Sequence, residues 1–197
     1  MIRVLIADDQ DMVRGGLAAL LSLEDDIEVV AEVARGDLVA DAVLEHHPDV
    51  VLLDIEMPGV SGLAVAERLR DCRVVIVTTF GRPGYLSRAL AAGVAGYVVK
   101  DAPAAELADA VRRVTSGERV IDPKLAVAAL TTGTSPLTTR ECDVLRSASS
   151  GATVADIARG LYLTEGTVRN YLSSAISKTG ARNRIEAARV AASQGWL

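Results

Sequence analysis

The chain has 197 residues, half of them apolar, and a formal net charge of −5. No apolar run approaches the roughly 18 residues of a membrane span, and the N-terminal apolar segment runs into two Asp, which is untypical of a signal peptide. One Trp and one Phe are too few for a protein that stacks nucleic-acid bases on aromatic side chains. Two isolated cysteines without metal-type spacing favour a reducing, cytoplasmic location.

The charge is unevenly distributed along the chain. Residues 1–134 hold 13 basic and 21 acidic side chains, whereas residues 135–197 hold 8 basic and 5 acidic ones. The first part therefore has a net charge of −8 and the second a net charge of +3. This asymmetry suggests two domains with different partners, of which the second could bind a polyanion.

Strand and helix patterns alternate in the first 117 residues. Apolar runs typical of buried strands occur at 2–7, 28–34, 50–53, 74–77 and 96–99. Apolar residues recur at helical spacing near 13–21, 37–45, 63–70, 85–92 and 107–117. This order predicts an α/β fold, a five-stranded parallel, doubly wound (βα)5 sheet with helices on both faces.

The rest of the chain lacks convincing strands. Residues 118–134 predict a linker with at most a turn or two of helix, around 125–130. Residues 135–197 contain four helix starts, at the capping residues Thr138 (with Glu141 in a capping box), Thr153, Thr164 and Asn183. We therefore expect a small all-α domain after the α/β domain.

Polar side chains follow the predicted strands at their carboxyl ends, where open α/β sheets bind ligands. These residues are Asp8 and Asp9 after the first strand, Asp54 after the third, Thr78 at the end of the fourth and Lys100 after the fifth. Three carboxylates at one edge would repel one another without a cation, and oxygen ligands suit Mg²⁺. A hydroxyl and an ammonium suit a phosphoryl group, so the set predicts a site for an acyl phosphate on Asp54.

Each of these residues also has a plain structural explanation. A lone Asp before Pro-Gly is usually a turn former, Asp8-Asp9 could cap the next helix, and Lys100 could be a solvated strand end. Chance would then have to place all of these features at successive strand ends, which favours the site. The pair His46-His47 lies on a polar helix end and is interpreted as surface rather than as a metal site.

These motifs resemble the receiver domain of two-component response regulators. The resemblance covers residues 1–117 and rests on Asp8-Asp9, Asp54 with Met57-Pro58-Gly59 and Gly62, Thr78, and Gly96 to Lys100. It implies that Asp54 is the phosphoacceptor. Asp9, Asp54 and the backbone carbonyl of Glu56 would bind Mg²⁺, with Asp8 acting through water. Thr78 and Lys100 would bind phosphoryl oxygens, and Tyr97 would be an aromatic switch. Glu56 and Phe80 would flank the pocket and tune hydrolysis of the acyl phosphate.

The chain departs from the receiver pattern between the third helix and the fourth strand. Only Asp71 and Cys72 separate Arg70 from Arg73, so we expect a trimmed connection that leaves the phosphoryl pocket intact.

Residues 153–178 have the lengths of a helix, a short turn and a second helix. In the second helix the apolar side chains must face the core, which leaves a small, polar outward face that can enter a major groove. Arg169 and Asn170 are candidate base readers because Arg pairs with guanine and Asn with adenine. The remaining candidates for DNA contact are Ser173 on the same face and Thr164, Thr167, Lys178 and Arg182 toward phosphates. From its charge alone, this second helix could equally well be a solvated amphipathic helix that does not bind DNA.

The order of motifs in residues 135–197 resembles the LuxR-type helix-turn-helix of NarL/FixJ regulators. It rests on Leu137-Thr138-x-Arg140-Glu141, Ile157-Ala158, Leu163-Thr164-x-x-Thr167-Val168-x-Asn170-Tyr171 and Lys178. Glu165 to Tyr171 and the final Gly195-Trp196-Leu197 are most similar to DesR-type regulators of membrane-lipid desaturation. Many relatives carry His and Lys where this chain has Tyr171 and Ser173, a change that should weaken attraction to phosphates. The last helix, with Ile185, Ala188 and Ala192, is either a dimer contact or plain packing.

Together the resemblances imply a transcription factor and not an enzyme. A membrane-bound sensor histidine kinase would phosphorylate Asp54, and the resulting homodimer would bind two half-sites in double-stranded promoter DNA and act on RNA polymerase. One alternative is a regulator that binds DNA without phosphorylation. Another is a Mg²⁺-dependent aspartyl-phosphatase, but such enzymes usually place a second Asp two residues on, where this chain has Glu56.

Overall fold

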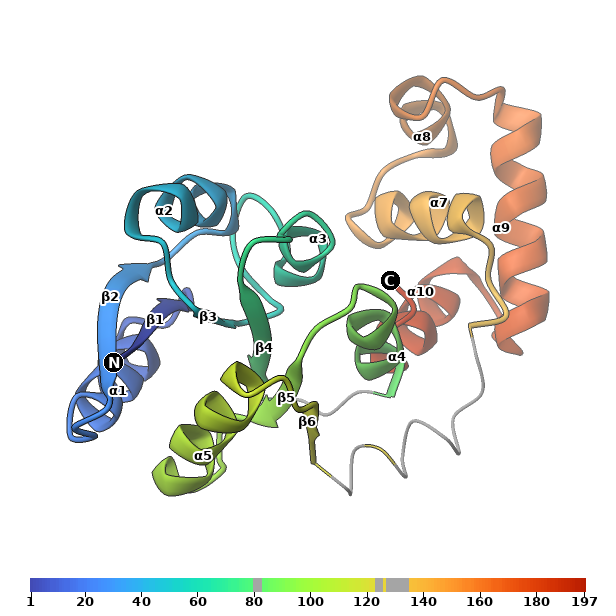
Figure 1. Ribbon diagram of the computed structural model, residues 1–197. Coiled ribbons are helices and arrows are strands. Elements are labelled where there is room, and N and C mark those ends of the chain that lie inside the picture. Colours follow the sequence, from blue (N-terminus) through green and yellow to red (C-terminus); the bar gives the residue numbers. More distant parts are fainter. Residues whose placement is uncertain (80–82, 123–125, 127–134) are drawn as a thin grey trace. The chain divides into compact units, whose positions relative to one another are not determined.

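The structure is a computed structural model that describes residues 1–79, 83–122, 126 and 135–197. These residues divide into two compact units, one built around a β-sheet and one built mainly from the helices after residue 135 (Figure 1). Residues 83–85 are grouped with the second unit. Within the described residues, no helix combines the length and the apolar composition needed to cross a membrane.

The first unit contains a parallel sheet with the strand order β2-β1-β3-β4-β5-β6. Its strands are β1 (Ile2–Ala7), β2 (Ile27–Val33), β3 (Val50–Leu53), β4 (Arg73–Thr78), β5 (Gly96–Val99) and β6 (Val120–Ile121). All four side chains of β3 are buried, as expected of a central strand with both faces covered. The predicted parallel, doubly wound α/β fold is confirmed.

The sheet has one more strand than the five predicted. The short strand β6 lies in the stretch interpreted as linker and pairs in parallel with β5, so that Val120 is opposite Gly96 and Ile121 is opposite Tyr97. It satisfies backbone groups on the open side of β5, for example through the Val120 N–H that donates to the Ala95 carbonyl at 2.9 Å. Two residues carry no periodicity, so the sequence pattern could not reveal this strand.

Helices follow each of the first five strands. They are α1 (Asp11–Leu21), η1 (Gly36–Leu38) with α2 (Val39–His46), α3 (Gly62–Ala66), α4 (Pro83–Ala91) and α5 (Ala104–Thr115). Alternate strand side chains such as Val4, Ile6 and Leu52 share a core cluster with residues of α1 and α5. The intervening strand residues are buried as well, which leaves both faces of the sheet covered.

Helix α3 is shorter than the predicted helix at 63–70. It ends at Ala66, and a turn leads to β4, which begins at Arg73. A groove of about 1090 Å³ opens beside this trimmed connection, with Cys72 and Pro48 among its lining residues. The groove lies at the amino ends of the strands, opposite to the edge where Asp54 follows β3.

The second unit consists of α7 (Thr139–Ser149), α8 (Val154–Gly160), α9 (Glu165–Thr179) and α10 (Arg184–Ser193). The predicted caps are present: Thr138 forms a capping box with Glu141, and the side chains of Thr153, Thr164 and Asn183 accept backbone N–H groups of the next three helices. Val144, Leu145, Val168, Ala175 and Ala191 are among the fully buried side chains of one shared core. The expected small all-α domain is therefore observed.

Candidate functional site

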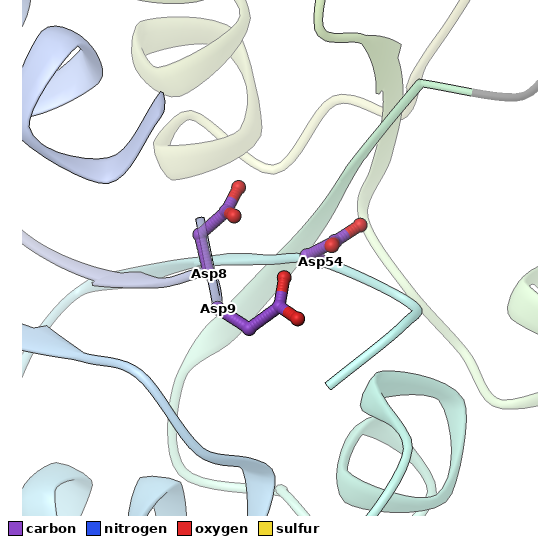
Figure 2. Close-up of side chains that lie close together, drawn as sticks. All are labelled: Asp8, Asp9 and Asp54. Atoms are coloured by element: carbon purple, nitrogen blue, oxygen red, sulfur yellow. The ribbon is translucent and has the colours of Figure 1, made fainter. Parts of the chain in front are cut away.

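Three carboxylates gather beyond the ends of β1 and β3. The strands are neighbours and Ala7 lies opposite Leu53, so the residues that follow them emerge at the same edge of the sheet. Asp8, Asp9 and Asp54 each offer a carboxylate oxygen, and these oxygens lie within 4.8 Å of one another (Figure 2). Asp8 and Asp54 are buried, whereas Asp9 is exposed.

Backbone contacts fix the two buried carboxylates. The Asp54 N–H donates to the Ala7 carbonyl at 2.9 Å, which continues the pairing of β3 with β1. The Ile55 N–H donates to Asp54 Oδ1 at 2.8 Å, and the Gln10 N–H donates to Asp8 Oδ1 at 2.9 Å. Gly62 is needed nearby because a Cβ there would lie 1.8 Å from the Asp54 carbonyl oxygen. Asp54 is thus held in one orientation.

Lys100 joins the two buried carboxylates. Its Nζ lies 2.7 Å from Asp8 Oδ2 and 3.1 Å from Asp54 Oδ2, and its side chain is only 5% exposed. The Lys100 N–H donates to the Thr78 carbonyl at 2.8 Å, which extends the pairing of β5 with β4. The lysine therefore reaches the acidic cluster from a strand two places away from β3.

The charges of the cluster influence one another. Burial raises the pKa of Asp54, although the Lys100 ammonium opposes the shift. Burial alone would lower the pKa of Lys100, but its contacts with Asp8 and Asp54 outweigh burial and raise it. With all groups ionised, three carboxylates and one ammonium leave two negative charges, which a divalent cation would neutralise. Carboxylate oxygens are also the ligands that Mg²⁺ prefers, so the donor set fits this ion.

The other predicted pocket residues lie around this edge. Thr78 is buried at the end of β4 and pairs with Val99 of β5. Tyr97 is completely buried in β5, so its ring is directed inward in this structure. Glu56 lies two residues after Asp54 with an exposed side chain. Phe80 lies outside the described residues, as does most of the predicted helical turn at 125–130.

Helix α9 presents the predicted polar face. Val168, Leu172 and Ala175 are buried in the core of the second unit. The exposed residues include Gly166, Arg169, Asn170, Ser173 and Ser177. Tyr171, singled out as a departure from the family, instead packs against the core of this unit.

The start of α9 is held by hydroxyl groups. Thr164 Oγ1 accepts the Thr167 N–H at 3.1 Å, and the two hydroxyls lie 2.8 Å apart. Arg169 is tied to the same turn, because its Nη2 donates to Glu165 Oε2 at 2.6 Å.

Two predicted phosphate contacts are already engaged within the unit. Lys178 Nζ donates to Glu141 Oε2 at 2.8 Å, and Arg182 Nε donates to Glu186 Oε2 at 2.9 Å. Sequence reasoning recognised Glu141 as half of a capping box but missed its second role as the partner of Lys178. The two residues are 37 positions apart in the sequence, so no local sequence pattern could have predicted their contact.

All five acidic side chains of residues 135–197 form ion pairs within the unit. The pairs are Glu141–Lys178, Asp143–Arg146, Asp156–Arg159, Glu165–Arg169 and Glu186–Arg182. Three arginines of this stretch, Arg140, Arg184 and Arg189, have no such partner among the residues that the structure describes. They account for the net charge of +3 and were not among the predicted contacts.

In α10, the side chains proposed as one face differ in environment. Ile185 is 73% exposed, whereas Ala188 is buried in the core of the unit. Packing within the unit therefore explains the apolar side chain of Ala188. Of these two residues, only Ile185 is accessible to a partner.

Comparison with known proteins identifies relatives of both units. The family model for the response regulator receiver domain matches residues 4–112, and the model for bacterial regulatory proteins of the luxR family matches residues 135–191. The transcriptional regulatory proteins YvfU and DesR of Bacillus subtilis are 47% and 46% identical over 201 and 199 residues, which cover all of each chain. A crystal structure of the response regulator ChrA, from a heme-sensing two-component system, is 34% identical with a TM-score of 0.59 and covers 100% of this chain and 98% of that one.

Proposed function

Because the chain belongs to the response regulators that combine a receiver domain with a LuxR-type DNA-binding domain, we propose that phosphorylation of Asp54 controls its activity as a transcription factor. In this proposal residues 1–117 form the receiver, residues 135–197 bind DNA, and residues 118–134 connect them. The start of the connection, at Val120–Ile121, also serves as strand β6.

The contact of Lys100 with both buried carboxylates carries the assignment of Asp54 as phosphoacceptor. The Asp54 carboxylate would attack the phosphorus of a phosphohistidine, forming a P–O bond while the P–N bond to the kinase breaks. Lys100 already places positive charge beside Asp54 Oδ2, and Thr78 would add a hydroxyl donor for the phosphoryl oxygens.

Asp8, Asp9, Asp54 and the backbone carbonyl of Glu56 are proposed to hold Mg²⁺, with Asp8 acting through water. When bound, Mg²⁺ would neutralise the charge that accumulates on the transferred group. Tyr97 is proposed as the switch residue that couples the state of Asp54 to the receiver surface and so promotes dimerisation.

Helix α9 is proposed to read DNA in the major groove. Arg169 and Asn170 would contact base edges, with Ser173 on the same face, while Thr164 and Thr167 would contact phosphates. Lys178 and Arg182 would have to leave their carboxylate partners to do the same. A dimer would bind half-sites about 34 Å, or one turn of DNA, apart.

The partners follow from the family. We propose a membrane-bound sensor histidine kinase as phosphoryl donor, promoter DNA as target, RNA polymerase as the machinery regulated, and a cytoplasmic location. The identity of 46% with DesR and the resemblance of Glu165–Tyr171 to DesR-type regulators support a role in regulating membrane-lipid desaturation.

Two measurements test the phosphoacceptor. Acetyl phosphate should label the wild-type chain in a Mg²⁺-dependent manner, and Asp54→Asn should abolish labelling, whereas the exposed control Asp71→Asn should not. Labelling of Asp54→Asn would move the acceptor to another residue.

DNA-site selection with and without phosphorylation tests the switch. Equal site affinity in both states would support the alternative of a regulator that binds DNA without phosphorylation. Sustained turnover of small phosphate esters would instead overturn the proposal in favour of a phosphatase.

A further inference from the structure

Glu165 places a carboxylate on the surface of α9 that carries the proposed base readers. It is the first residue of the helix, and Arg169 follows one turn later on the same side. Arg169 Nη2 donates to Glu165 Oε2 at 2.6 Å, and the two side chains are 62% and 49% exposed. Both groups are thus accessible to a ligand while they are in contact with each other.

A structural role alone would account for an acidic residue here only in part. A carboxylate in the first turn favours a helix, and exposed pairs at this spacing stabilise it weakly. The start of α9 is already capped by Thr164, whose hydroxyl accepts the Thr167 N–H. On a surface that approaches DNA, the same carboxylate is repelled by phosphates and weakens binding to any sequence.

The pair also removes positive charge from the reading surface. Arg169 is balanced by Glu165, and Asn170 and Ser173 are neutral, so the net charge of +3 in this unit comes from Arg140, Arg184 and Arg189. The outward face of α9 therefore contributes little attraction to DNA until its side chains find matching bases.

We propose that Glu165 is a specificity-determining residue that holds Arg169 in the orientation for reading guanine. This inference rests on the proposed DNA-binding function. The contact with Glu165 involves Nη2, one of the guanidinium nitrogens, and a guanidinium carries five N–H donors, so a fork remains for the O6 and N7 of a guanine. Restricting Arg169 before binding reduces the conformational entropy that is lost on contact with the base.

Glu165 also acts against the wrong sites. Where no guanine is present, Arg169 would have to abandon Glu165 to reach a phosphate, and the unpaired carboxylate would then face the DNA backbone. Specificity increases because this repulsion lowers affinity for other sequences while the correct site retains the pair.

The test separates the position of the carboxylate from its charge. Glu165→Asp keeps an acid in the first turn but is one methylene shorter and cannot hold Arg169 in the same way. Glu165→Ala removes the charge as well. Asp143→Ala is the matched control, because it makes the same charge change by breaking an exposed pair on α7.

Site selection and affinity should be measured with the full phosphorylated chain, on the selected site and on a scrambled duplex. Glu165→Asp should reduce discrimination at the guanine position about tenfold, while affinity for the scrambled duplex stays within about twofold. Glu165→Ala should lose the same discrimination and bind the scrambled duplex several-fold more tightly than Asp143→Ala does. In an Arg169→Ala background, Glu165→Asp should have no further effect on base preference.

An unchanged motif and unchanged discrimination in Glu165→Asp would overturn the inference and leave Glu165 with a role in helix stability alone. A different result would contradict the proposed function itself. In that case the wild-type chain would select no DNA motif in either phosphorylation state. The two failures are distinguishable because the wild type is tested first.

Discussion

The buried carboxylate of Glu141 should dominate the acid sensitivity of the second unit. The residue is only 3% exposed and accepts hydrogen bonds from the Thr138 N–H at 2.6 Å, Ser174 Oγ at 2.6 Å and Lys178 Nζ at 2.8 Å. Burial alone would raise the pKa of Glu141, but these donors, Lys178 first, outweigh it and lower the pKa from 4.5 to about 2. The ionised form of the Glu141 carboxylate is therefore more stable in the folded unit than in the unfolded chain.

The direction of the pH dependence follows from the lowered pKa. The stabilisation is fully present above the unfolded value of 4.5 and is lost as the pH falls toward about 2. The difference of about 2.5 pH units corresponds to roughly 3 kcal/mol. Because the Lys178 side chain is 36% exposed and its charge is partly screened by water, we expect about 2 kcal/mol.

Glu141→Gln should therefore lower the free energy of unfolding of this unit by about 2 kcal/mol at neutral pH. The difference from wild type should shrink to near zero as the pH is lowered from about 5 to about 2. Trp196, the single tryptophan of the chain, packs against the core of this unit, so its fluorescence during urea unfolding reports on this unit specifically.

Asp143→Asn is a suitable control, since it alters a partly exposed carboxylate in the same helix and should change the unfolding free energy by less than about 0.5 kcal/mol. The reasoning would be refuted by a Glu141→Gln chain that loses stability in acid as steeply as wild type does.

Three other predictions concern separate parts of the chain. Gly62→Ala should destabilise the receiver by more than about 2 kcal/mol and slow labelling of Asp54, because its Cβ would lie 1.8 Å from the Asp54 carbonyl oxygen; Gly15→Ala, where a Cβ meets nothing within 4 Å, is the control for thermal unfolding. Arg169→Ala should cost about 1–3 kcal/mol at the selected site and relax its base preference, whereas an unchanged preference in site selection would make Arg169 a backbone contact. The Cys72 thiol, whose pKa burial and the nearby Asp71 raise to about 11, should react with iodoacetamide far more slowly at pH 8 than free glutathione does, and a rate equal to that of glutathione would contradict the burial.

The acidic cluster was predictable because each of its residues follows a local sequence pattern that identifies a strand. A run of four apolar residues before Asp54 identifies a buried strand, and parallel strands bring their carboxyl ends to one edge. The same topology places Lys100 at that edge, whereas its ion pairs with Asp8 and Asp54 were not predicted. The outward face of α9 was predictable for a similar reason, since helical spacing alone separates Val168 from Arg169.

Features that depend on distant or very short segments were not predictable. The periodicity near 63–70 suggested a longer helix than the observed Gly62–Ala66, because the pattern does not record where the chain must turn toward β4. The sequence suggested Lys178 and Arg182 as contacts for DNA phosphates, although each has a carboxylate partner in the folded unit. Pairing of this kind is decided by tertiary packing.

The short strand β6 has a practical consequence for dissecting the protein. A receiver fragment that ends at residue 117 would lack Val120 and Ile121 and would present the outer side of β5 as a row of unpaired backbone groups. Such an uncovered edge is a template for association with the edge of another molecule. Self-association of that fragment would then be an artefact of where the chain was cut, and a fragment that continues through Asp122 would keep the edge of β5 covered.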